Sequence, residues 1–136
     1  MTLASRRLAS VLLVVLPTVM YGGVTLLTML IRDPRYMANP VRQNLWRAGH
    51  AHAGVLLVLA LISLRYVDDA HLSERSKAVA RSFIPLAAIL MPSGFFLSMA
   101  SPSATGPSAV IALTYLGAVV LAIGVATLGV GLLRRA

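Results

Sequence analysis

Four long apolar segments alternate with short polar ones along the chain. They cover about residues 8–31, 48–64, 83–100 and 109–133. A helix needs about 20 predominantly apolar residues to cross the hydrocarbon core of a bilayer. The segments are too long for strands and do not alternate strictly, and a segment in lipid has to satisfy its own backbone hydrogen bonds. The pattern therefore predicts an all-α integral membrane protein in which four transmembrane helices form one compact bundle.

The composition leaves little of the chain for a soluble domain. Hydrophobic residues make up 58% of the sequence and charged residues 12%, so we expect a single membrane domain over residues 1–136. Arg6 and Arg7 before the first apolar segment resemble the start of a secretory signal. This segment is longer than the 7 to 15 apolar residues that are usual in such a signal, so we expect it to stay as a helix. The absence of cysteine excludes disulfides, thiolate metal ligands and thioether-bound haem.

The basic residues predict the orientation of the chain. With four spans, both termini lie on the same side of the membrane. The loops on that side hold Arg6, Arg7, Arg65, Arg75, Lys77, Arg81, Arg134 and Arg135, and the other side holds Arg32, Arg35, Arg42 and Arg47. The positive-inside rule then predicts cytoplasmic termini in a bacterial-type inner membrane. We do not expect a nucleic acid as partner, because no folded basic surface or aromatic platform accompanies these residues.

The loop after the first span is unusually basic for an outer loop. Its arginines bind lipid phosphates, with Tyr36 and Trp46 as interfacial anchors, or they hold an anionic group of a bound ligand; the sequence leaves both interpretations open. Asn39 and Pro40 are typical of an N-cap and a first helical residue. They predict a helix that begins near Pro40 and continues into the second span.

The most informative stretch, Arg47-Ala-Gly-His-Ala-His-Ala-Gly54, lies where this helix enters the apolar segment. An ionisable side chain at this depth is costly, which makes it a candidate functional residue. At about 100° per residue, Arg47, His50 and Gly54 share one face, and His52 points about 200° away from His50. A regular helix cannot bring both imidazoles to one metal ion. Either the two histidines serve different neighbours, or the helix is unwound there.

Residues 42–64 resemble the second helix of haem-copper oxidase subunit I and of its smaller relatives, such as the nitric-oxide-response haem membrane proteins. In that family a histidine near the outer end of this helix binds haem b, and nearby arginines hold the propionates. The resemblance implies that His50 or His52 is the axial ligand and that Arg47 and Arg42 are propionate partners. Gly54, one turn below His50, would leave room for a flat group. The other spans carry no histidine, so we do not expect this chain alone to reduce oxygen or nitric oxide.

Two methionines could complete such a site. Met29 and Met99 lie near the outer ends of the first and third spans, and His/Met ligation holds haem iron in some proteins. The same residues would also suit Cu(I), which ranks below haem because the methionines are not clustered. A purely structural role is the alternative to the haem and copper hypotheses, because methionine often fills gaps in apolar cores and histidine often forms hydrogen bonds across helices. A quinone head group is also compatible, because histidine can donate to a carbonyl oxygen.

The rest of the chain carries no catalytic motif, so we do not expect an enzyme by itself. The first hypothesis is a small haem-binding or redox-associated membrane protein that acts in electron transfer, gas sensing or haem handling. The alternatives are an accessory subunit or scaffold of a larger membrane complex, and a homo-oligomer that handles copper or small solutes.

The sequence also predicts three structural features. The small-residue stripe through Gly117, Gly124 and Gly131 predicts a packing face within the bundle or between copies. Residues 65–74 predict a solvated loop in which Asp or Ser caps the next helix. Prolines at positions 17, 85 and 92 predict kinks in the first and third helices.

Overall fold

The computed structural model describes residues 1–134 and is helical throughout its regular parts. The elements are α1 (Leu3–Arg32), α2 (Pro34–Met37), α3 (Pro40–Tyr66), α4 (Glu74–Ser98), the 3-10 turn η1 (Ala109–Ile111) and α5 (Ala112–Leu133). No strand occurs in this part of the chain, and the predicted all-α fold with four long apolar helices is confirmed. Arg135, one of the predicted cytoplasmic residues, lies outside the described residues.

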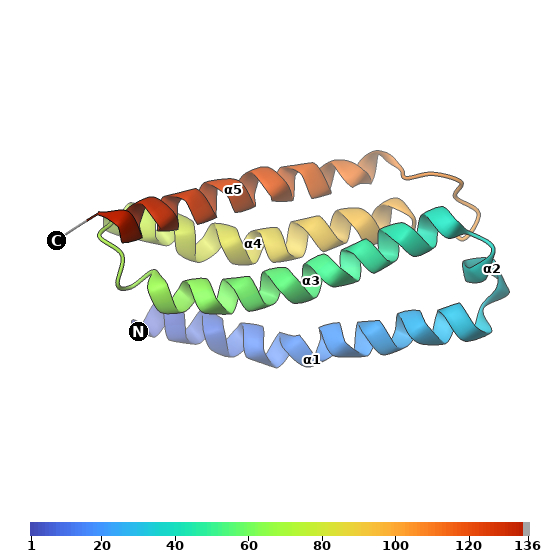
Figure 1. Ribbon diagram of the computed structural model, residues 1–136, viewed down its shortest axis with the longest axis horizontal. Helices are drawn as coiled ribbons and strands as arrows, with labels where there is room; N and C mark the ends of the chain where they lie inside the picture. The colour runs from blue at the N-terminus through green and yellow to red at the C-terminus, as the bar shows by residue number, and fades with distance from the viewer. Residues whose placement is uncertain (135–136) are drawn as a thin grey trace.

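The long helices lie side by side in chain order (Figure 1). α1 packs chiefly against α3, α3 against α4, and α4 against α5, so α1 forms one edge of the row. This bundle is more open than the compact arrangement that the sequence predicts. Short loops make consecutive helices antiparallel neighbours, and lipid can cover the faces that in water would need a protein partner. The start of α1 and the end of α5 lie at the same end of the row, as an even number of crossings requires.

The surface of the helices suits a bilayer. All four long helices are long and apolar enough to cross a membrane. Their exposed side chains are largely apolar, and on α1 Val14 is 77% exposed and Tyr21 74% exposed. Apolar groups on a lipid-facing surface need no burial inside the protein. These features indicate a multi-pass membrane protein.

The most extensive contact between helices is the one between α4 and α5, and it uses the predicted glycine stripe. A Cβ atom on Gly124 would lie 2.9 Å from Ile84 Cγ1, and one on Gly117 would lie 2.9 Å from the backbone nitrogen of Met91. Gly131 is buried against Leu72 in the loop before α4. The stripe is therefore a packing face within the chain, which decides between the two predicted alternatives.

The helix boundaries follow local capping signals. The Asn39 side chain accepts a hydrogen bond from the backbone N–H of Arg42, and α3 begins at Pro40 as predicted. The Ser73 hydroxyl accepts from the N–H of Ser76 and caps α4. The prediction of a serine or aspartate cap in this loop is confirmed.

Prolines lie inside two of the long helices without ending them. α1 contains Pro17, and α4 contains Pro85 and Pro92. Figure 1 shows α1 bowed near its middle, as expected for a helix that loses one backbone hydrogen bond to proline.

Candidate functional site

His50 lies against a pair of glycines in α1. A Cβ atom on Gly23 would lie 2.9 Å from His50 Nε2 and 3.1 Å from Cε1, and one on Gly22 would lie 3.8 Å from Nδ1. A side chain at position 23 would therefore collide with the imidazole. The glycine allows α1 to approach α3 closely at this point.

His52 points toward a different neighbour. Its Nδ1 lies 2.7 Å from the carbonyl oxygen of Ala48 in the preceding turn, and because that oxygen can only accept, Nδ1 carries the proton. The His52 ring lies 5.1 Å from the ring of Phe95 on α4. Since α3 is helical from Pro40 to Tyr66, the histidines face different neighbours, as the helical geometry requires.

A cavity of about 360 Å³, here called the His50 cavity, lies between α1, α2 and α3 near the end of the row opposite the termini. Its lining consists of a leucine wall from α1 and polar side chains from α2 and α3: Gly23, Leu26, Leu27, Leu30, Tyr36, Arg47 and His50. Small-molecule sites are typically about 300 to 1,000 Å³ and mainly apolar with a few polar groups. The structure thus brings Arg47 and His50 to one cavity, as their shared helix face predicts, and adds Tyr36.

Tyr36 is the most buried residue of this lining. Its side chain is 1% exposed, and its hydroxyl has no hydrogen-bond partner among the described residues. Asp33 fixes its position, because the Asp33 carboxylate caps α2 and accepts from the N–H groups of Arg35 and Tyr36. Burial raises the pKa of the Tyr36 hydroxyl, although nearby arginine charges oppose this. The hydroxyl is therefore protonated at neutral pH and can donate.

The two predicted arginines have different surroundings. Arg47 is exposed at the cavity, and its Nη2 donates to the side-chain oxygen of Asn44, 3.0 Å away. Arg42 is only 5% exposed and does not line the cavity. Its Nη2 donates to the carbonyl oxygen of Ala100 at 3.3 Å, and its guanidinium carbon lies 4.1 Å from the centre of the Trp46 ring. No residue in the described part of the chain accepts from its Nε. Arg42 thus connects α3 to the end of α4.

The remaining predicted residues lie outside the cavity lining. A Cβ atom on Gly54 would meet only Val19 Cγ1, at an ordinary 3.9 Å. Met29 is partly buried in α1, and Met99 is fully buried at the C-cap of α4. Within residues 1–134, no group of three or more His, Cys, Asp or Glu side chains could hold a metal ion.

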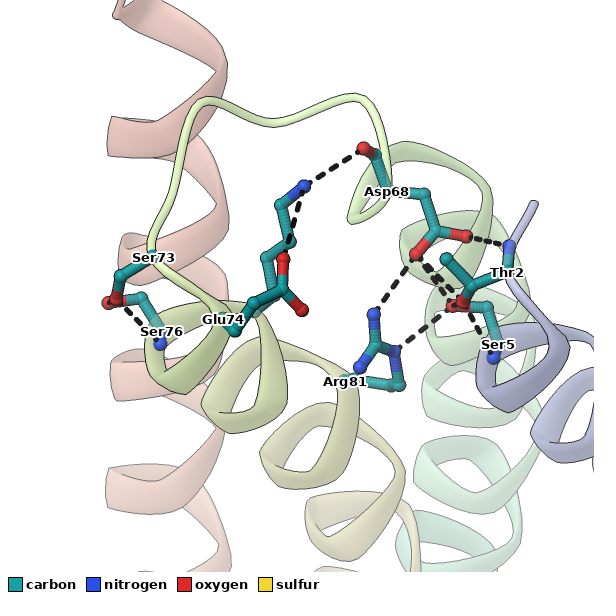
Figure 2. Close-up of polar contacts among 8 residues, drawn as sticks. Thr2, Ser5, Asp68, Ser73, Glu74, Ser76 and Arg81 are labelled. Carbon is teal, nitrogen blue, oxygen red and sulfur yellow. Dashed lines mark hydrogen bonds and ion pairs between the residues drawn. The ribbon is translucent and has the colours of Figure 1, made fainter.

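A polar cluster that the sequence analysis did not anticipate lies at the opposite end of the row (Figure 2). Here the Asp68 carboxylate accepts hydrogen bonds from the Thr2 N–H at 2.6 Å, the Ser5 hydroxyl at 3.0 Å and Arg81 Nη2 at 3.0 Å. The Thr2 hydroxyl also donates to Asp68, and Arg81 Nε donates to Ser5. We call Thr2, Ser5, Asp68 and Arg81 the Asp68 cluster. It ties the start of α1 to α4 and to the loop between α3 and α4.

The two charged side chains of the Asp68 cluster are largely buried, although Asp68 belongs to a loop and Thr2 is exposed. The side chain of Asp68 is 8% exposed and that of Arg81 13%. Burial by itself would raise the pKa of the Asp68 carboxyl, but the hydrogen bonds from Thr2, Ser5 and Arg81 lower it to about 2. The prediction of a solvated loop is therefore wrong for Asp68, because α1 and α4 cover this side chain. It holds for Asp69, whose ion pair with Arg65 is exposed.

The fold and the cavity together define a multi-pass helical protein with a ligand-sized site between its first two long helices. Comparisons of the chain with protein-family models, with curated proteins and with solved structures found no match.

Proposed function

We propose that this chain is a small redox-associated membrane protein that binds a membrane-soluble ligand in the His50 cavity. The observation that supports this proposal is the lining of the cavity. His50, Arg47 and Tyr36 line it together with the wall of three leucines from α1. Leu27 and Leu30 of this wall are 57% and 39% exposed, so the cavity borders the lipid-facing surface. A ligand with an apolar body and an oxygen-bearing head matches both halves of the lining.

The protein belongs, in this proposal, to a bacterial-type cytoplasmic membrane with both termini in the cytoplasm. The support is the distribution of charge. The end of the row that carries the termini holds most of the Arg and Lys residues, and the positive-inside rule assigns such an end to the cytoplasm. The His50 cavity then lies toward the outer leaflet.

Binding of haem b at His50 stays a prediction, and it would require α1 to move relative to α3. An axial ligand needs a ring nitrogen that points into open space. Nε2 faces Gly23 and Nδ1 faces Gly22, so the edge of the imidazole that carries both nitrogens is covered by α1. As packed here, His50 does not fit a porphyrin, and haem could bind only if α1 withdrew from α3. Copper has less support, because neither Met29 nor Met99 lines the cavity.

The test is to identify what the purified protein carries. We would purify the wild-type protein in mild detergent, record its oxidised and dithionite-reduced visible spectra, and analyse an organic extract by mass spectrometry. We expect a redox-active, lipid-soluble compound that is retained by the wild type and by His52→Ala but is lost from His50→Ala. A Soret band that depends on His50 would identify haem. A wild-type protein without any bound redox compound would contradict the proposal.

An accessory or scaffold role is the second candidate, and the surroundings of His52 favour it. That imidazole bonds its own helix and packs on Phe95, which is a structural use of histidine in a membrane helix. A scaffold would co-purify with a fixed membrane partner, as a homo-oligomer or a larger complex, and His50→Ala would leave this association unchanged.

A further inference from the structure

We infer that the ligand of the His50 cavity is a membrane quinone, and that the Tyr36 hydroxyl donates a hydrogen bond to one oxygen of its head group. The inference rests on the proposed function and names the ligand class of the same site. It depends on the donors of the cavity, on their burial, and on the leucine wall.

The polar side of the cavity offers donors and no acid. Tyr36, Arg47 and His50 are its polar side chains, and no Asp or Glu lines it. The Tyr36 hydroxyl is protonated and a guanidinium only donates. The His50 nitrogens face Gly22 and Gly23 of α1, so the imidazole contributes its ring surface to the lining. The head group that satisfies such a lining is one that accepts hydrogen bonds.

The most buried of these donors is uncharged. Tyr36 is 1% exposed, whereas Arg47 is exposed and already donates to Asn44. A buried anion such as a phosphate needs a buried cation close by, because removing it from water is costly. Neutral carbonyl oxygens need only hydrogen-bond donors. The lining therefore favours a quinone carbonyl over an anionic lipid head.

The Tyr36 hydroxyl is a donor without an acceptor. A buried hydroxyl normally has a partner in a folded protein, and one without a partner destabilises the fold. No described residue accepts from this group, and the group belongs to a side chain that lines the cavity. The hydroxyl itself is covered in this arrangement, so a ligand oxygen in the cavity supplies the missing acceptor once the Tyr36 ring shifts toward the cavity.

The opposite wall suits the tail of a quinone. Leu26, Leu27 and Leu30 come from one stretch of α1, and the last two are partly exposed. An isoprenoid tail can follow these side chains out of the cavity into the bilayer. The volume of about 360 Å³ is near the lower end of the usual range for small-molecule sites, which fits a single ring better than a large macrocycle.

Trp46 provides a reporter for the test, because it is the only tryptophan in the chain and its ring lies 5.9 Å from that of Tyr36. We would place the full chain in nanodiscs of zwitterionic lipid and titrate it with ubiquinone-1, whose head group quenches tryptophan fluorescence. We expect saturable quenching in the wild type. Loss of one hydrogen bond in Tyr36→Phe should weaken binding about fivefold. Tyr115→Phe, on an exposed part of α5, is the matched control and should bind like the wild type.

The outcomes separate the ligand class from the proposed function. Equal affinity of the wild type and Tyr36→Phe would overturn the role of the hydroxyl, and absence of saturable quenching would overturn the quinone. Displacement of ubiquinone-1 by oleate at lower concentration than by a second quinone would assign the site to an anionic amphiphile instead. In each case, a redox compound that co-purifies only when His50 is present would leave the proposed function standing. Its absence would remove both.

Discussion

The two ends of the helix row treat buried polar groups in opposite ways. In the Asp68 cluster the carboxylate and the guanidinium form an ion pair, and hydroxyl and backbone groups complete the network. At the other end, the Tyr36 hydroxyl and Arg42 Nε are buried, and neither has a hydrogen-bond partner within residues 1–134. A satisfied network holds structural elements in one arrangement, whereas an unsatisfied donor beside a cavity leaves binding capacity unused. The comparison teaches which end has a complete hydrogen-bond network and which end keeps buried donors that a ligand would satisfy in the proposed function.

α1 depends on both ends, because it has fewer protein neighbours than the other long helices. It packs chiefly on α3. The apolar 18-residue stretch of α1 that is suited to cross a membrane contains no buried residue. Its attachments are the Asp68 cluster at its start and the contact of Gly22 and Gly23 with His50 farther along. Changes in these attachments should therefore decide whether α1 stays in place.

The largest effect is expected from Asp68→Ala. This change leaves the largely buried Arg81 without its carboxylate and should lower the free energy of unfolding by about 3 kcal/mol. Asp69→Ala is the matched control, because the side chains of its ion pair with Arg65 are 61% and 62% exposed and such a pair contributes about 1 kcal/mol or less. Unfolding in detergent, followed by circular dichroism, measures both. Equal losses would show that the Asp68 cluster is not the tie that we describe.

Acid should weaken the same end. The folded-state pKa of Asp68 is about 2, below its ordinary value of 3.8, so the ionised carboxylate is the form that stabilises the fold. This stabilisation is complete above about pH 4 and is lost as the pH falls through 2. The full loss lowers the free energy of unfolding by about 2 kcal/mol. The unfolding free energy of the wild type should fall over this range, and that of Asp68→Asn should fall less. Parallel pH profiles would contradict the assignment.

The helical features near the cavity could be predicted because they are local. Asn39 and Pro40 predict the start of α3, and the spacing of His50 and His52 predicts that they face different sides. Both follow from backbone geometry within one helix, which neighbouring elements do not alter. The glycine stripe of α5 is predictable for the same reason, although only the structure shows that its partner is α4.

The polar groups that distinguish the two ends could not be predicted in this way. Ser5 and Asp68 are 63 positions apart, and nothing in their local sequence shows that α1 and the loop meet. Tyr36 has the sequence context of an interfacial aromatic residue, and its burial depends on how α1, α2 and α3 pack together. The available signal was that Tyr36 precedes several arginines and His50 by a short distance along the chain. This proximity does not determine whether the Tyr36 side chain is buried.

A smaller loss is expected when α1 is pushed away from His50. Gly23→Ala places a methyl group about 2.9 Å from Nε2. Overpacking of about 1 to 2 kcal/mol offsets the gain in helix propensity, so this variant should be less stable than Gly22→Ala by about 1 to 2 kcal/mol. Gly22→Ala is the neighbouring control, because its methyl group lies at an ordinary 3.8 Å from Nδ1 and alanine is the better helix former by about 1 kcal/mol.

The double variant Gly23→Ala with His50→Ala isolates the contact. If the imidazole is the obstacle, truncating it should recover about 1 kcal/mol relative to the sum of the single variants. Additive losses would mean that the methyl group at position 23 meets the α3 backbone instead. The same detergent unfolding experiment measures the wild type, the two single variants and the double variant.

The smallest expected change has the opposite sign. Tyr36→Phe removes a buried hydroxyl that has no acceptor, so the ligand-free protein should become more stable by about 1 kcal/mol. Tyr115→Phe, with a side chain that is 68% exposed, should stay within about 0.5 kcal/mol of the wild type. If the Tyr36 hydroxyl serves ligand binding and not folding, its removal should raise the stability of the ligand-free protein and lower its affinity for quinone. If Tyr36→Phe instead destabilises the ligand-free protein, the hydroxyl has a partner within the fold, and the contrast between the two ends of the row disappears.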